Sequence, residues 1–449
     1  MRELHDFTEG KILAPLLKFA LPVMLAMFLQ SMYGAVDLLV VGQFGHTTDV
    51  SAVATGSMLT QCVTLTISSL SMGVTILMGQ YIGRKKLEET GKVMGSGIVL
   101  FAVIAVVATL IFVTLTEPIA RLMQAPEEAF DQTVAYMRIC FAGLVFIVAF
   151  NMLGSIFRGM GDSNMPLITV AIACVVNIFG DLLLVAVFKM GAAGAAWATV
   201  AAQAVSVLLS LVIIRRRKLP FEFSKKYVRW NGKYIGHILK LGVPMSAQDL
   251  LISISFLVIM AIINNLGLNQ SAAVGVAEKV CGFLMLIPSA YSQSLSAFVA
   301  QNYGACKMER ARKAMFCGMA ISFLTALVMW YLAFFQGSLL SSIFSNDQAV
   351  IALAADYLRA YGLDCLMVSF FFCLTGYFSG IGKTTFVMIQ GILGAFFVRI
   401  PVSFLMSRIP DVSLFMVGLA TPCSSFVQLL LCTGYYIYLR RKEKRLGEV

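Results

Sequence analysis

The stretch Phe157-Arg158-Gly159-Met160-Gly161 recurs in the same chain, 221 residues later, as Phe378-Ser379-Gly380-Ile381-Gly382. The same spacing relates Tyr136-Met137-Arg138 to Tyr357-Leu358-Arg359 without a gap. Near the start of the chain the spacing becomes 222, where Lys18 and Pro22 match Lys240 and Pro244. A duplication of this length in a hydrophobic protein is typical of secondary transporters, whose binding sites lie at the interface between repeats.

The composition places the chain in a membrane. Hydrophobic residues make up 59% of the 449 residues and charged residues only 13%, which is not the balance of a soluble domain. Crossing the hydrocarbon core takes about 20 apolar residues. We therefore predict an all-α polytopic membrane protein with twelve transmembrane helices, near residues 14–41, 51–79, 93–116, 132–156, 164–188, 192–214, 236–264, 272–300, 314–336, 349–377, 384–406 and 412–439.

The basic residues predict the orientation of the chain. Most of the 34 lysine and arginine residues lie near the N-terminus, in alternate loops, or in the tail that starts at Arg440. The positive-inside rule then places both termini in the cytoplasm, with the chain in the cell (plasma) membrane. The net charge of +11 is explained by topology and by contact with anionic inner-leaflet lipid, so we expect no nucleic-acid partner.

The duplication predicts two pseudo-symmetric lobes. Six spans in each repeat give parallel topology and a pseudo-two-fold axis along the membrane normal, with the cavity between the lobes. We predict an N-terminal six-helix lobe at 1–214, a cytoplasmic linker at 215–235, and a C-terminal six-helix lobe at 236–449 that ends in a basic cytoplasmic tail. We expect a monomer to be functional.

Motifs for catalysis are not recognised in the sequence. There is no Walker A motif, the three histidines have no ligand spacing, and the ten cysteines form no Cys-x-x-Cys pair. We therefore expect a protein that is not an enzyme and needs no cofactor. Transport would then draw on an ion gradient.

Acidic residues inside the predicted spans are the first candidates for function. An ionised side chain at bilayer depth costs at least about 2.5 kcal/mol, so such residues are rare unless they are used. Asp37 and Asp181 fall in the first repeat, and the second repeat contains Asp249, Glu278 and Asp364. Each also has a structural interpretation: Asp37 could reach the outer headgroups, Glu278 could form an ion pair, and the others could simply hold helices together.

The most informative local pattern is Asn177-Ile178-Phe179-Gly180-Asp181. Residues four apart share one helix face, so the amide of Asn177 and the carboxyl group of Asp181 are neighbours. Such an oxygen-rich face suits a proton or a hard cation such as sodium. The alternative is a hydrogen bond that only joins two membrane helices.

Aromatic and methionine residues are abundant, with 33 phenylalanines and 25 methionines. A deformable cavity of these side chains would accept varied amphipathic cations. Core packing or lipid contact is the better explanation for any single one of these residues.

Several motifs together resemble the multidrug and toxic compound extrusion (MATE) family, over essentially the whole chain. Gln80-Tyr81-Ile82-Gly83 and Gln301-Asn302-Tyr303-Gly304 close the second and eighth spans in register with the duplication. The other matching features are Pro22, Val36-Asp37, Val41-Gly42 and Arg158 to Asp162.

The resemblance implies a prokaryotic, cation-coupled antiporter that exports amphipathic, often cationic drugs or toxins by alternating access. It also implies a proton or sodium site in the N-terminal lobe formed by Asp37, Asn177, Asp181 and Thr199, with Asn151 as a further polar wall. Other branches carry acids on the seventh span and low on the tenth, where this chain has Ile252 and Val368. Glu278, Asp364 and Asp249 therefore stay secondary candidates.

A second interpretation from the same superfamily is a flippase for a lipid-linked saccharide. Its cavity would display basic residues for a pyrophosphate group, and only Lys279 and Arg399 are available at depth. In either case we expect a small amphipathic substrate and membrane lipid as the partners.

Overall fold

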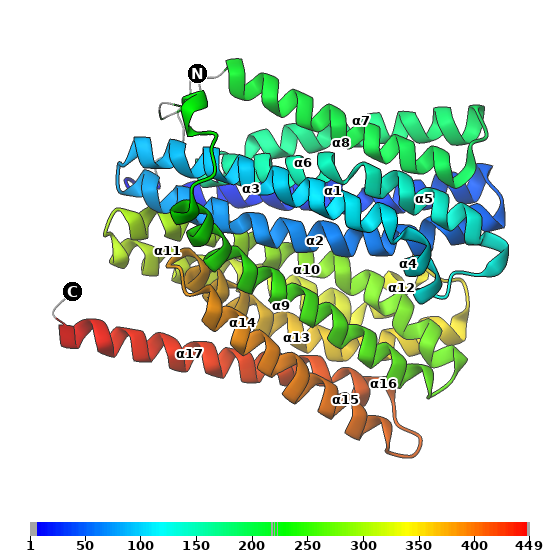
Figure 1. Cartoon of the computed structure of the whole chain (residues 1–449). Coiled ribbons are helices and arrows are strands. Elements are labelled where there is room, and N and C mark those ends of the chain that lie inside the picture. The colour runs from blue at the N-terminus through cyan, green and yellow to red at the C-terminus, as the bar shows by residue number, and fades with distance from the viewer. Residues whose placement is uncertain (1–6, 217–218, 220, 222, 447–449) are drawn as a thin grey trace. The chain divides into compact units, whose positions relative to one another are not determined.

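A computed structural model describes residues 7–216, 219, 221 and 223–446, and every regular element in these residues is a helix (Figure 1). The predicted all-α fold is confirmed. Some residues used above to argue orientation lie outside the described residues, namely Arg2, Arg217, Lys218 and residues 447–449.

The first half of the chain forms the first six spans. The helices exceed the apolar runs that predicted them, because polar ends such as Gln80–Gly83 continue the helix. The spans are α1 (Leu13–Phe44), α2 (Thr47–Gly83), α3 (Leu87–Thr114), α5 (Phe130–Ala142) with α6 (Leu144–Gly159), α7 (Asn164–Asp181) continued by the π-helix η2 (Leu182–Val187), and α8 (Gly191–Arg216).

The second half repeats this order. Asp347 caps the central helix of this half by accepting a hydrogen bond from the backbone N–H of Ala349 at 2.8 Å. The spans are α9 (Gly232–Asn264), α10 (Leu268–Gly304), α11 (Met308–Phe335), α13 (Gln348–Gly380), α14 (Thr384–Ile392) with the π-helix η4 (Leu393–Arg399) and α15 (Ile400–Ser407), and α16 (Leu414–Gly418) with α17 (Ala420–Leu446). Short helices connect the spans: α4 (Thr116–Leu122), η1 (Glu127–Ala129), η3 (Lys225–Tyr227) and α12 (Gly337–Ser342).

The fourth span is broken, which the sequence did not predict. Its two parts, α5 and α6, are bent by 46° around Gly143. A Cβ atom at Gly143 would lie 2.4 Å from a methyl group of Val200 on α8, so only glycine allows this approach. With the bent pair counted as one span, the described residues contain the twelve spans expected.

The chain divides into two compact units. The first unit contains the described residues of Leu21–Ser246 together with Gly304–Cys306. The second unit contains Gly10–Ala20, Ala247–Tyr303 and the described residues from Lys307 onward. The lobe boundaries given by the sequence remain a prediction.

The two units bury a tyrosine at the same position of the repeat. In the first unit α2 packs on α5 and α6, α7 packs on α8, and Tyr136 of α5 is 2% exposed in the core. In the second unit α13 packs on α11 and α17, and Tyr357 of α13 is again 2% exposed. Because Tyr136 and Tyr357 are partners in the duplication, the repeat extends from the sequence to the packing.

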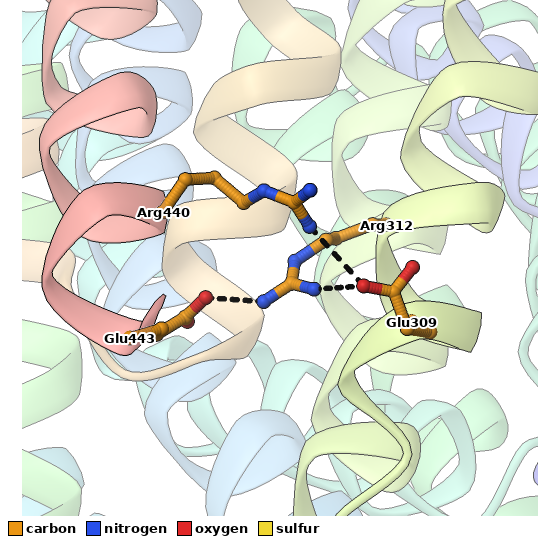
Figure 2. Close-up of polar contacts among 4 residues, drawn as sticks. All are labelled: Glu309, Arg312, Arg440 and Glu443. Atoms are coloured by element: carbon orange, nitrogen blue, oxygen red, sulfur yellow. Dashed lines mark hydrogen bonds and ion pairs between the residues drawn. The ribbon is translucent and has the colours of Figure 1, made fainter. Parts of the chain in front are cut away.

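A cluster of four charged residues joins the start of α11 to the end of α17 (Figure 2). Arg312, whose side chain is 5% exposed, donates to both Glu309 and Glu443. Arg440 also bonds Glu309, at 3.1 Å. Two segments 131 residues apart are thereby held together within the second unit.

Candidate ion-binding site

Asp37 lies inside the first unit. Its side chain is 1% exposed, so it does not reach a headgroup region. Asn177 of α7 donates its Nδ2 hydrogen to one carboxylate oxygen at 3.1 Å, and the hydroxyl of Thr199 on α8 donates to the other at 2.9 Å. The carboxyl group of α1 is thus held by two neighbouring helices, each supplying one donor.

Asn177 and Thr199 also contact each other, with Nδ2 and Oγ1 3.3 Å apart. The amide oxygen of Asn177 is buried and receives no hydrogen bond from the described residues. A buried oxygen that accepts no hydrogen bond costs free energy, because it has lost its contact with water. This oxygen is therefore available to a bound proton carrier or cation.

Asp181 completes the arrangement. It lies four residues after Asn177 on α7 and is fully buried, and neither of its carboxylate oxygens receives a donor from the described residues. Its carboxyl group lies within hydrogen-bonding range of that of Asp37. Two carboxyl groups can share a hydrogen bond only when one of them holds a proton, and otherwise they repel each other.

The donor set fits a hard cation or a proton. Two carboxyl groups, an amide oxygen and a hydroxyl oxygen are the ligand types that such cations prefer. No lysine or arginine of the described residues is within ion-pair distance of Asp37 or Asp181. The described residues therefore supply no ion-pair partner for this buried pair.

The π-helix η2 begins directly after Asp181. Such segments are rare and frequently mark functional sites. Here the change of helix type falls at the carboxyl-bearing residue of the predicted site.

Asn151 of α6 is the fifth residue predicted for this site. It is buried, and its Nδ2 atom donates to the carbonyl of Ile147 in its own helix at 2.9 Å. No hydrogen bond within the described residues joins it to the four residues above, so its part as a polar wall remains a prediction.

The three secondary candidates lie in the second unit. Asp364 is 2% exposed, and one of its oxygens has no donor among the described residues. Glu278 is half-buried with one unpaired buried oxygen, while Lys279 beside it is exposed. Asp249 is half-buried on α9, where its backbone carbonyl accepts the hydroxyl of Ser253 at 2.8 Å.

Tyr136 is a site neighbour that sequence reasoning did not single out. Its buried phenol lies within electrostatic reach of both Asp37 and Asp181. The sequence contained one signal, since Tyr136 is a matched position of the duplication, but that signal equally fits a core residue. Only the tertiary structure distinguishes the two, because it places Tyr136 in one buried cluster with Val40 and Val41 of α1, close to Asp37.

The long apolar helices and the buried carboxyl pair define a multi-pass membrane protein with an ionisable centre inside its first unit. The MatE family model matches residues 22–183 and, separately, residues 244–405, which together exceed half of the chain. The chain belongs to the MatE family of multidrug efflux transporters.

Individual relatives agree with this assignment. The chain is similar to "Probable multidrug resistance protein YoeA" of Bacillus subtilis, with 28% identity over 436 residues, covering 95% of this chain and 94% of that protein. It is also similar to "Multidrug export protein MepA" of Staphylococcus saprophyticus, with 25% identity over 419 residues and coverage of 90% and 89%.

Two solved structures share the fold. A crystal structure of MATE in complex with MaL6 superposes with a TM-score of 0.92 and 18% identity, covering 100% of both chains. A MOP-superfamily transporter from Pyrococcus furiosus gives a TM-score of 0.91 at 18% identity, also over the full length of both.

Proposed function

We propose that this protein is a cation-coupled antiporter that exports amphipathic small molecules from the cell by alternating access. The observation that carries the proposal is the pair of buried carboxyl groups, Asp37 and Asp181, which lie within interaction range of each other and have no basic partner among the described residues. A buried charge without a partner is unstable, so the pair favours uptake of a cation. The coupling ion is a proton or sodium.

Each residue of the site has a distinct part in this mechanism. Asp37 and Asp181 supply the negative charge, and Asn177 and Thr199 orient Asp37 through the bonds at 3.1 and 2.9 Å. With sodium bound, the amide oxygen of Asn177 and the hydroxyl oxygen of Thr199 would join the carboxylate ligands. With a proton bound, the two carboxyl groups would share it.

Coupling follows from reciprocity. If the cation and the substrate each favour a different conformation, binding of one lowers the affinity for the other by the same factor. An inward cation gradient would then drive the substrate outward. The names of these relatives, a multidrug resistance protein and a multidrug export protein, support drug-like substrates. The positive-inside pattern supports a plasma-membrane protein with both termini in the cytoplasm.

The test is efflux of a cationic dye, ethidium, from proteoliposomes under an imposed pH gradient and, separately, an imposed sodium gradient. Wild-type protein is expected to respond to one of the two. Asp37→Asn removes the charge with little change of shape, and its efflux is expected to fall to the rate of protein-free vesicles. The matched control is Glu117→Gln, the same chemical change at an exposed carboxylate paired with Arg138. Unchanged efflux by the Asp37→Asn protein would overturn the proposal.

A further inference from the structure

The duplication allows the site of the first unit to be compared with its counterpart in the second. The two matches to the MatE family, 22–183 and 244–405, are offset by 222 at both ends. Ala198-Thr199 recurs as Ala420-Thr421 at the same offset. The positions that correspond to the site residues are therefore those 222 residues further on.

The structure explains why the offset changes along the chain. At Ile168 and Ile389 it is still 221, and the π-helix η4 (Leu393–Arg399) follows directly in the second half. A π-helical turn closes i to i+5 rather than i to i+4, so it takes one more residue than an α-helical turn. We place the extra residue of the second repeat in η4 before Arg399, because the offset beyond this region is 222, both at the ends of the two family matches and at Thr199 and Thr421.

This correspondence reverses the charge of the site. Asp37 and Asp181 correspond to Ile259 and Ser403, so both carboxyl groups are absent from the counterpart. Thr199 corresponds to Thr421, which keeps the hydroxyl. Asn177 corresponds to Arg399, so a guanidinium group stands where the first unit has an amide.

Arg399 is enclosed as a bound cation would be. Its side chain is 6% exposed, and its guanidinium carbon lies 4.5 Å from the ring centroid of Phe256. One nitrogen donates to the hydroxyl of Ser255 at 3.4 Å. Its Nε atom is buried with no acceptor among the described residues.

The negative charge near Arg399 comes from a different helix. Asp364 of α13 interacts electrostatically with Arg399, although the two do not form an ion pair within 4.0 Å in the described residues. At the offset of 221 that relates α13 to the first repeat, Asp364 corresponds to Gly143, where Val200 leaves no room for a side chain. The second unit therefore has an acidic residue near Arg399 at a position where the first unit has none.

We propose that Arg399 is a tethered cation, which occupies in the second unit the place that an exchangeable ion takes in the first. The proposal rests on the ion site at Asp37 and Asp181, and it limits the number of exchangeable cations that each chain binds. The fixed charge of the guanidinium balances that of Asp364 through space, without a direct ion pair in the described residues, so the second unit binds no exchangeable ion there. Each chain then carries one exchangeable cation in the pair of repeats, and removal of the guanidinium exposes a second site at Asp364.

The test counts cations bound per chain on purified full-length protein in detergent. The probes are ²²Na⁺ at equilibrium and, in sodium-free buffer, protons taken up relative to wild type. Arg399→Gln is expected to bind one more cation per chain than wild type. Arg399→Lys keeps the tethered charge and should show the wild-type count, as should Asp364→Asn/Arg399→Gln, which removes both charges. An unchanged count for folded Arg399→Gln protein would overturn the proposal.

Arg399→Gln removes one member of a pair of buried charged groups, which destabilises a folded protein. A second variant therefore tests the proposal without removing Arg399. Asp364→Asn in the wild-type background should leave the cation count unchanged, since Asp364 is already neutralised by Arg399. A count lower by one would make Asp364 an exchangeable site and overturn the proposal. Asp37→Asn tests the proposed ion site of the first unit separately: a cation count equal to that of wild type would contradict that site. The extra cation bound by Arg399→Gln tests only the tethered cation of the second unit.

Discussion

At the scale of single residues, the two carboxyl groups of the site differ in how they are held. Asp37 receives two hydrogen bonds, from Asn177 and Thr199, whereas Asp181 receives none from the described residues. Hydrogen bonds to a charged group are worth about 1.5–3 kcal/mol, so Asp37 is the better stabilised anion. Asp181 is then the group whose charge most needs a bound cation.

This difference predicts the behaviour of Asp181→Asn. A cation that binds only the folded protein stabilises it by about 2.7 kcal/mol at one hundred times its Kd. Wild-type protein should therefore unfold at a higher temperature when the coupling ion is supplied, and Asp181→Asn should lose that dependence because one of the two charges is gone. Thermal unfolding in detergent, with sodium chloride against choline chloride and across a pH series, measures this. A cation-dependent shift that persists in Asp181→Asn, as in the Glu117→Gln control, would contradict it.

At the scale of elements, the broken fourth span shows what a glycine does inside a membrane helix. The bend between α5 and α6 brings Gly143 against Val200 of α8. The same helix α5 carries Tyr136, which interacts electrostatically with Asp37 and Asp181.

Gly143→Ala is expected to destabilise the first unit by about 1–3 kcal/mol, because the added methyl overlaps Val200. Val200→Ala removes the two methyl groups that would lie nearest to the added Cβ atom at position 143, at 2.4 and 2.8 Å from it. The double variant should therefore lose less stability than the sum of the two single variants, which a double-mutant cycle of thermal or denaturant unfolding measures. Strict additivity would contradict the contact.

The cluster at the start of α11 and the end of α17 gives a second prediction at this scale (Figure 2). Arg312→Ala leaves Glu443 facing a partly buried space without its partner and should cost about 3–5 kcal/mol. Arg440→Ala breaks a contact whose two side chains are 36% and 62% exposed, and should cost about 1 kcal/mol or less. Unfolding temperatures of the two variants test the ranking, and equal losses would contradict the buried role of Arg312.

At the scale of the whole molecule, the prediction that the termini face the cytoplasm also fixes the side of each loop. Cys306, between α10 and α11, and Cys423 on α17 are exposed, and Cys62 and Cys317 are half-buried. The other cysteines are buried, namely Cys140, Cys174, Cys281, Cys365, Cys373 and Cys432. The basic residues around Cys306 predict that its loop lies on the cytoplasmic side.

A membrane-impermeant maleimide should therefore label Cys306 in inside-out vesicles and leave it unlabelled in intact cells. Cys306→Ser is the matched control, because it removes only the reactive sulfur of an exposed loop residue. Labelling of Cys306 from outside the cell would invert the topology and, with it, the direction of the proposed transport.

The sequence by itself determined the number of spans, their approximate bounds, the duplication and the pairing of Asn177 with Asp181. These features depend on local composition and on the helical period, which a single sequence contains. The convergence of Asp37 and Thr199 on Asn177 was expected only through resemblance to a family. Thr199 alone, in an alanine-rich helix, predicts a bond to its own backbone.

The tertiary structure decided which helix faces meet. It turned the Thr199 hydroxyl toward Asp37, bent the fourth span at Gly143, left Asp181 without a donor among the described residues and set Arg399 against Phe256 and Ser255 of α9. The period of an apolar helix in lipid says where its polar residues lie, but not which neighbour they meet. In a membrane that choice depends on close packing and on hydrogen bonds between helices, so it belongs to the assembled fold.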